Sequence, residues 1–359
     1  MLVPEDLLRR DHLLASGALA TGLPGLRAAV GPKPGKFAHQ WQRDERNPIL
    51  LPGPGDFDSQ GCFAPFVVCR DGEYFLFYAG VRKDSVRICV ATAPVGRLTE
   101  WKRYGPILEL GTAGAFDEVW QIYPCVHRVG NQWHLYYTGQ SRRTGPQYFS
   151  AFWGIGLAMS DDLLHWKKYG TEPVVTGEGY PGFPDNKVIV GLGRILDVPQ
   201  PDGRMLYRLY HTLPPALHNE DRTVTQRKFC VVAHSDDGIR WFDKRILFGP
   251  QPEVDYENIG VVGLTFWKSK ARYRGLYTAL GTRFGSMSYV MCEAASEDGL
   301  AWERPAGENL SLFPVQQGWD VTMAGYPCVI EEEDQIRLFY NGATLGATGI
   351  GTAMARKLE

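Results

Sequence analysis

The tetrapeptide Tyr-Pro-Cys-Val occurs twice in this chain, at residues 123–126 and again at residues 326–329. Each copy follows an aromatic residue paired with an aspartate: Phe116-Asp117 before the first copy and Trp319-Asp320 before the second. A repeated segment of this kind indicates that one supersecondary unit is used several times in the fold.

The same unit recurs in weaker form. Phe57-Asp58 precedes Pro65 by a matching interval, and we place two further copies at Asp185 and Asp255. Each copy is followed by an aromatic run such as Tyr-Phe-Leu-Phe-Tyr at 74–78, then by an alanine-containing run, then by a turn that leads to a tryptophan. These runs predict four antiparallel strands per repeat, and four-stranded units repeated around an axis make a β-propeller.

The last repeat lacks its tryptophan strand, and that strand occurs at the other end of the chain. Residues 41–50, which begin with Trp41, parallel the segment that begins with Trp101. We therefore predict an all-β, five-bladed β-propeller with four-stranded antiparallel blades, in which the N-terminal strand completes the last blade. Such closure removes an exposed sheet edge.

Composition narrows the function classes. The chain has 359 residues, and 44% of them are hydrophobic, which is enough to form a packed core. Its formal net charge is -2, which argues against a nucleic-acid-binding protein. Its 7 cysteines show no zinc-ligand spacing and lie mostly in apolar strand patterns, which predicts small buried side chains.

The first residues differ from the rest. Arg9-Arg10 precedes a weakly apolar, small-residue stretch at 13–23, a pattern that resembles a bacterial twin-arginine signal peptide. An ordinary amphipathic helix is the alternative. We expect residues 1–36 to be a signal and linker, residues 37–359 to be the propeller, and the protein to be periplasmic or secreted. The stretch is too short and glycine-rich for a stable membrane span.

The repeat pattern resembles the five-bladed propeller glycoside hydrolases, the superfamily of arabinanases, xylosidases and invertases. The residues that carry the resemblance are the unit from Phe57-Asp58 to Tyr78-Ala79-Gly80, its copy from Phe116-Asp117 to Tyr137-Thr138-Gly139, and the Ser-Asp-Asp-Gly turn before Trp241. The resemblance implies an enzyme that cleaves an oligo- or polysaccharide. Members usually have an aspartate directly before the proline of the first inner strand, and here that position is Ala64.

Glycoside hydrolysis needs two carboxyl groups across the scissile bond. The resemblance implies a nucleophile or base from the first blade, which favours Asp58, and further acids from the middle blades, which favour Asp185 and Glu257. Glu257 and Asp185 have no obvious counterparts in the other copies, so a repeated backbone role explains them less well. For Asp117 and Asp320 a structural role in the repeat weighs more heavily than catalysis.

Other residues of the inner strands are candidate substrate contacts. Aromatic rings could stack on a sugar, and polar groups could bind its hydroxyls; the candidates are Asp117, Glu118, Trp120, Gln121, Tyr123, Arg194 and Asp320. His211 fits an ordinary strand histidine better than a ligand. We expect no cofactor, and a central structural cation such as calcium stays open. Two rival functions also remain open: a carbohydrate-binding propeller without catalysis, which Ala64 favours, and a glycoside phosphorylase, for which Arg194 is the one basic candidate.

Overall fold

The computed structural model describes residues 35–55, 57–141, 153–185, 189–214, 227–284, 288–315 and 317–357. The expected signal at the N-terminus therefore lies outside the described residues, apart from the end of its linker. Within the described part, strands dominate, and α2 (Ala343–Gly346) is a single helical turn.

Each group of four strands forms an antiparallel unit. The first unit contains β2 (Gly61–Arg70), β3 (Glu73–Arg82), β4 (Ser85–Pro94) and β5 (Lys102–Pro106). The second contains β6 (Trp120–Val129), β7 (Gln132–Gln140), β8 (Trp153–Ser160) and β9 (Lys167–Lys168). The third contains β10 (Ile195–Pro199), β11 (Met205–Leu213), β12 (Phe229–Ser235) and β13 (Phe242–Phe248). The fourth contains β14 (Gly260–Ser269), β15 (Arg272–Gly281), β16 (Ser288–Ser296) and β17 (Leu310–Leu312).

The last unit draws on both ends of the chain. It contains β18 (Gly325–Glu331), β19 (Gln335–Asn341), β20 (Ile350–Arg356) and β1 (Gln42–Arg43). β1 pairs antiparallel with β20, so that Gln42 lies opposite Met354 and Arg43 opposite Ala353. The predicted contribution of the N-terminal strand to the last unit is thus confirmed.

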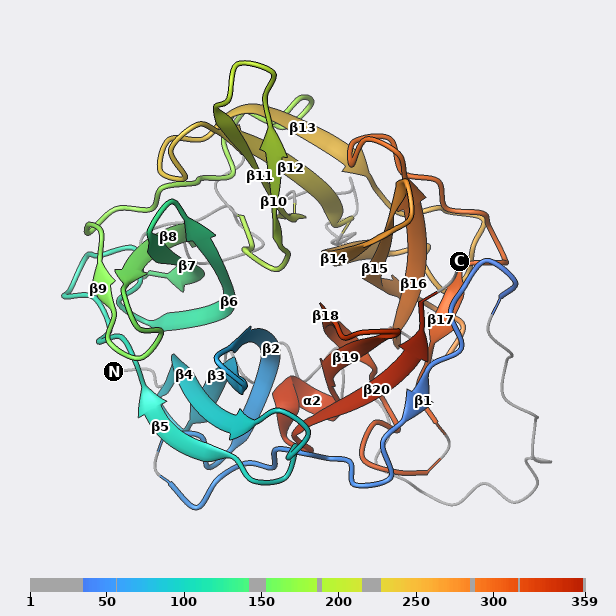
Figure 1. Cartoon of the computed structure of the whole chain (residues 1–359), viewed down its shortest axis with the longest axis horizontal. Coiled ribbons are helices and arrows are strands. Elements are labelled where there is room, and N and C mark those ends of the chain that lie inside the picture. Colours follow the sequence, from blue (N-terminus) through green and yellow to red (C-terminus); the bar gives the residue numbers. More distant parts are fainter. Residues whose placement is uncertain are drawn as a thin grey trace, which may run out of the picture.

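The units stand around a common centre (Figure 1), with the first strand of each nearest the centre and the last strand at the periphery. A parallel bridge between Val86 and Trp120 joins the first two units into one eight-stranded sheet. Elsewhere a side chain at the end of a unit's second strand accepts a hydrogen bond from the next unit. The pairs are Gly191 N to Thr138 Oγ1 (2.7 Å), Gly263 N to Thr212 Oγ1 (2.9 Å), Tyr326 N to Thr278 Oγ1 (2.8 Å) and Ala64 N to Asn341 Oδ1 (3.3 Å).

The first strands share a bulge near their inner ends. The register shifts between Phe63 and Phe66 in β2 and at the corresponding places in β6, β14 and β18. The bulge residues Ala64, Tyr123, Gly263 and Tyr326 have φ of 52°, 56°, 59° and 57°. Left-handed backbone costs a non-glycine residue roughly 1–2 kcal/mol, so its repetition at one position of the unit marks it as part of the blade geometry.

A buried charge cluster fastens the segment before β1 to the fourth unit. Glu293 of β16, which is fully buried, accepts a hydrogen bond from the His39 backbone N–H (2.7 Å) and contacts the His39 ring, Arg274 and Ser311. Burial alone would raise the pKa of Glu293, but these hydrogen bonds and charges hold it below its usual value. The N-terminal segment therefore joins the fourth unit to the last.

The cysteines contribute to the core as expected. All are free thiols, and all except Cys69 are buried. Cys62 and Cys89 lie in the first unit, and burial raises the pKa of Cys62 to about 12, so this thiol stays protonated.

Candidate functional site

Four of the units contain the same buried contact, which we call the carboxylate lock. An acidic residue before the first strand accepts a hydrogen bond from a tyrosine twenty residues later, and a cation two residues after a tryptophan pairs with the same carboxylate oxygen. The four sets are Asp58–Tyr78–Arg103, Asp117–Tyr137–Lys168, Glu257–Tyr277–Arg304 and Asp320–Tyr340–Arg43.

The four lock acids are buried, each with at most 1% of its surface exposed. The tyrosine hydroxyls lie 2.8, 2.9, 2.6 and 2.9 Å from their carboxylate oxygens, in the order given above. Burial raises the pKa of all four tyrosines, so each phenol remains a donor. Gly53 and Gly111 cover two of the acids, and an added Cβ at either would lie 2.4 Å from the Asp58 or Asp117 Oδ1 atom.

Glu257 belongs to one of these locks. We expected this residue to depart from the repeat, and that expectation is wrong: Glu257 is the fourth copy of the lock acid, and the aromatic-acid pair of that unit is Tyr256-Glu257. Asp255, two residues earlier, is exposed and pairs with Arg283 (2.8 Å). Burial raises the pKa of Glu257, and its side chain is fully buried.

The third unit has a different arrangement. His211 stands where the other units have the lock tyrosine, and its Nε2 accepts a hydrogen bond from the Tyr180 hydroxyl. The His211 Nδ1–H donates to the Leu209 carbonyl (2.9 Å), which leaves Nε2 as the acceptor, and burial lowers the pKa of His211 to about 3. Lys244 takes the place of the lock cation and donates to the carbonyls of Thr176 (3.0 Å) and Glu178 (2.7 Å).

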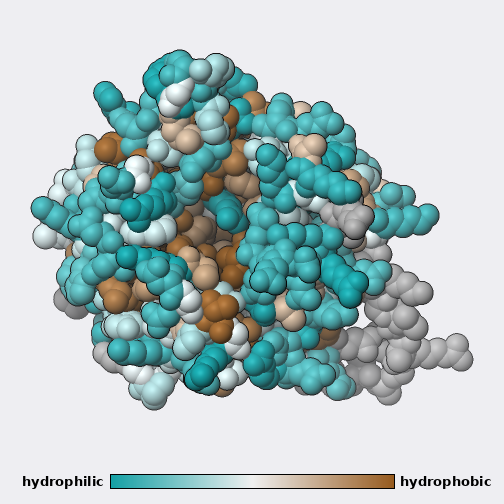
Figure 2. Space-filling model, in the orientation of Figure 1, coloured by the Kyte–Doolittle hydropathy of each residue, from teal (hydrophilic) through white to brown (hydrophobic). Residues whose placement is uncertain are grey.

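Aromatic side chains from separate units meet at the centre. The Tyr123 ring lies 6.0 Å from Phe63 and 5.5 Å from Tyr326, and Tyr289 lies 6.2 Å from Tyr326. Together with Trp120 and other apolar residues these rings form one cluster, which we call the central aromatic cluster. Figure 2 shows a hollow at the middle of the ring in which hydrophobic residues are gathered.

The bulge places a defined residue beside this cluster in each of four units. Ala64, Tyr123 and Tyr326 belong to the cluster or pack against it, and Gly263 holds the same position in β14. In the resembled enzymes the position before the first-blade proline holds an acid. Here the four bulge residues have no carboxyl group.

The remaining predicted site residues are dispersed. Asp185 is exposed, next to residues outside the described part of the chain. Glu118 accepts a hydrogen bond from the Gly114 backbone N–H (2.9 Å). Gln121 is buried and donates to the Asp117 lock (2.9 Å). Arg194 donates to the Phe266 (3.2 Å) and Val329 (2.6 Å) carbonyls, and so links the third, fourth and last units.

Of the candidate substrate contacts, Trp120 and Tyr123 lie in or against the central cluster, whereas Asp117 and Asp320 lie in locks. Asp58 and Glu257 lie in locks as well, and their catalytic roles stay predictions. The lock itself was readable in the sequence, since in four repeats a tyrosine follows an aromatic-acid pair at the same interval.

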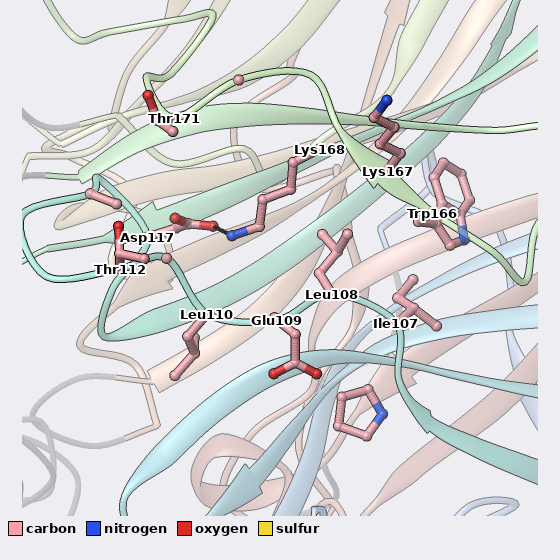
Figure 3. Close-up of a pocket in the computed structure, with 14 residues that line it drawn as sticks. Ile107, Leu108, Glu109, Leu110, Thr112, Asp117, Trp166, Lys167, Lys168 and Thr171 are labelled. Carbon is pink, nitrogen blue, oxygen red and sulfur yellow. Dashed lines mark ion pairs between the residues drawn. The ribbon is translucent and has the colours of Figure 1, made fainter.

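A pocket opens at the periphery between the first two units (Figure 3). It has a volume of about 520 Å³ and lies between residues 106–117, which lead out of β5, and residues 166–171 around β9. Lys168 and Asp117, joined by their ion pair of 2.6 Å, form part of its lining, together with Leu108 and Leu110 of the segment after β5.

In the described residues, no group of three or more His, Cys, Asp or Glu side chains is arranged to hold a metal ion. The same part of the chain has no helix with the length and apolar character needed to cross a bilayer.

No family model matches the chain. Two curated proteins of Mycobacterium tuberculosis, both described as uncharacterized, are 26% identical over 284 residues, which cover 78% of this chain and 86% of each relative.

Solved structures resemble the chain over most of its length. A glycosyl hydrolase from Bacteroides ovatus has a TM-score of 0.65 at 16% identity, covering 90% of this chain and 95% of its own. A structure described for the GH130 family of mannoside phosphorylases and hydrolases has a TM-score of 0.66 at 15% identity, with coverages of 90% and 95%. A thermostable family-43 glycoside hydrolase has a TM-score of 0.58 at 16% identity, with coverages of 82% and 89%. The chain thus has the fold of the propeller glycoside hydrolases, as its repeats predicted.

Proposed function

We propose that the protein is a carbohydrate-binding propeller in which a glycan packs against the central aromatic cluster. One observation supports this function above the others: the residues at the bulge positions beside the centre are Ala64, Tyr123, Gly263 and Tyr326, while four inner acids are held in buried locks. Aromatic faces pack well against the apolar face of a pyranose ring, and tyrosine adds a polar group at its tip. Cleavage would need two accessible carboxyl groups.

We further infer that the units are the blades of a five-bladed propeller that spans residues 37–359. Hydrogen bonds between neighbouring units run from the second to the third, the third to the fourth, the fourth to the last, and the last to the first. The described contacts with the fourth unit begin at Gly35, whose backbone N–H bonds to the Leu310 carbonyl (2.9 Å), two residues before this boundary. For residues 1–36 we keep the proposal of a twin-arginine export signal and of a periplasmic or secreted location.

Cleavage of a glycosidic bond, by water or by phosphate, is the second candidate. The solved structures that share this fold include hydrolases and a family of mannoside phosphorylases. In that case Asp58, Asp185 and Glu257 keep their predicted roles, and two of these acids would have to leave their locks to reach a substrate.

The deciding experiment is a glycan-array screen of the wild-type protein, paired with aryl-glycoside assays with and without inorganic phosphate. We expect glycan binding without turnover, and at least tenfold weaker binding for Tyr123→Ala. Tyr104→Ala, an exposed aromatic residue of the outer strand β5, is the matched control and should bind like wild type.

The variant Asp58→Asn separates the two candidates. As a lock residue, Asp58 balances the charge of Arg103, so its amide should lower stability by about 3 kcal/mol, the usual cost of breaking a buried pair, and leave glycan binding intact. Turnover by the wild type that Asp58→Asn abolishes without a change in melting temperature would overturn the proposal in favour of a hydrolase.

A further inference from the structure

The peripheral pocket of the second unit exists where that unit departs from its neighbours. In the first and last units the lock cation is an arginine, which also donates to a backbone carbonyl: Arg103 Nη2 to Leu51 O (2.5 Å) and Arg43 Nη2 to Phe313 O (2.6 Å). In the second unit the cation is Lys168, which is shorter and contacts Asp117 alone among the hydrogen bonds and ion pairs of the described residues. Both Lys168 and Asp117 line the pocket.

The backbone carbonyl that would receive such a guanidinium is already occupied. Glu109 stands two residues before Gly111, as Leu51 stands two residues before Gly53. The Glu109 carbonyl accepts a hydrogen bond from Gln121 Nε2 (2.8 Å). Gln121 therefore donates to the backbone carbonyl that corresponds to the one bound by the arginine in the first unit, and the lysine ammonium bonds to Asp117 at the edge of the pocket.

Lys168 can serve a ligand without leaving its lock. An ammonium has three donors, one of which goes to Asp117, and its side chain keeps 24% of its surface exposed. Figure 3 shows its Nζ atom beside the Asp117 carboxylate, and both residues line the pocket with Leu108 and Leu110.

The charges around the pocket favour an anion. Asp117 balances Lys168, and the Glu109 carboxylate pairs with Arg87 (2.9 Å), which leaves Lys167 as an additional positive charge in the lining. The rest of the lining mixes apolar side chains with hydroxyls: Ile107, Leu108, Leu110, Thr112 and Thr171. A volume of about 520 Å³ lies within the usual range for small-molecule sites.

We propose that this pocket is a second binding site, separate from the central cluster, for a hexuronate sugar. The ligand carboxylate accepts a hydrogen bond from Lys168, the threonine hydroxyls bond to the sugar hydroxyls, and the leucines pack against the ring. The choice of a sugar as the body of the ligand rests on the proposed carbohydrate function. The choice of a carboxylate rests on the lysine and its surroundings.

Ligand-detected NMR and calorimetry on the full chain test the site with glucuronate and galacturonate as probes. We expect both to bind, glucose and galactose to bind at least tenfold more weakly, and acetate to show no comparable affinity. Raising the ionic strength should weaken uronate binding because the contact is between charges.

Lys168→Arg is the informative variant, because it keeps the charge on Asp117 and fills the pocket as the arginine fills the first unit. It should fold like wild type and lose at least tenfold in uronate affinity. Arg103→Lys, the reciprocal change in the first unit, is the matched control and should leave uronate binding unchanged. Lys167→Ala should reduce affinity by a few-fold.

Three results would overturn the site: equal affinity of Lys168→Arg and wild type, equal binding of neutral and acidic sugars, or acetate binding as tightly as the uronates. A failure of the proposed central site would be detected by a different result. Tyr123→Ala would then bind neutral glycans as wild type does, while uronate binding at the peripheral pocket would be unaffected.

Discussion

The third unit differs from the first, second, fourth and last units in the charge of its buried inner contact. In the four, a buried carboxylate is balanced by a cation from the outer strand and bonded to a tyrosine, as in the first unit with Asp58, Arg103 and Tyr78. In the third, the neutral pair of His211 and Tyr180 takes the inner position, and Lys244 bonds to carbonyl oxygens.

The difference shows that the cation, not the acid, is the constant element of the unit. Every unit has a lysine or arginine two or three residues after a tryptophan whose side chain bonds to this part of the unit: Arg43, Arg103, Lys168, Lys244 and Arg304. In four units a carboxylate pairs with this cation, and in the third unit two backbone carbonyls accept its hydrogen bonds. The recurrence of an acid in a repeat is therefore a property of packing before it is a sign of catalysis.

The last unit offers the largest test, because its lock cation comes from the opposite end of the chain. Removal of residues 1–43 takes away Arg43, strand β1 and the His39 contact to Glu293. It would leave Asp320 buried with Tyr340 but without its cation, a penalty of about 3–5 kcal/mol for the broken buried pair. Glu293 would keep Arg274 and Ser311 but lose both of its bonds to His39. We expect the shortened protein to aggregate or to lose its cooperative melting transition in differential scanning calorimetry.

Removal of residues 1–34 is the control for this deletion. It retains every contact of the described N-terminal segment, from the Gly35 N–H bond to the Leu310 carbonyl onward. This variant should melt like the full chain. If both shortened proteins melt at the same temperature, the stability of the last unit does not depend on β1 or on the pairing of Arg43 with Asp320.

The next largest effect that we expect is a pH dependence of stability that comes from His211 in the third unit. Burial lowers the pKa of His211 to about 3 in the folded state, from 6.5. The unfolded chain therefore binds more protons between these values, so His211 favours folding above pH 6.5 and this contribution is lost as the pH falls toward 3. Each pH unit well inside the window costs about 1.4 kcal/mol.

We expect the free energy of unfolding of wild type, measured by urea titration, to fall between pH 7 and pH 5 by about 2 kcal/mol more than that of His211→Gln. His134, whose pKa burial lowers to about 4, has the same sign and stays in both proteins, so only the difference between the two curves reports His211. Parallel curves would mean that the ring is not held neutral by its site.

The sequence predicted the repeats, the four-stranded units and the return of the N-terminal strand, because these rest on local patterns of aromatic, turn and tryptophan residues. It misplaced the fourth acid by two residues, at Asp255 in place of Glu257, since either of two nearby acids fits the pattern until the tyrosine partner is identified. The replacement of the acid in the third unit could not be read, because Tyr180 reaches His211 from a connecting segment with no repeat signature. The peripheral pocket was equally hidden, because its lining brings together residues 106–117 and 166–171, which are far apart in the sequence.

The smallest expected effect concerns Lys244, whose counterpart in the second unit is Lys168. Lys168→Met would leave the Asp117 carboxylate buried with only the neutral donors Tyr137 and Gln121, and we expect it to cost about 3 kcal/mol of stability. Lys244→Met would leave only two carbonyls without a donor.

Burial already lowers the pKa of Lys244, which shows that desolvation of its charge opposes the two hydrogen bonds it makes. Replacing a buried ion by an apolar side chain of similar length is often close to neutral when no opposite charge is left behind. We therefore expect Lys244→Met to change the free energy of unfolding by about 1 kcal/mol or less in urea titrations at pH 7, at least 2 kcal/mol less than Lys168→Met. Equal losses for the two variants would mean that Lys244 is balanced by a carboxylate after all, and the distinction between the third unit and the other four would fall.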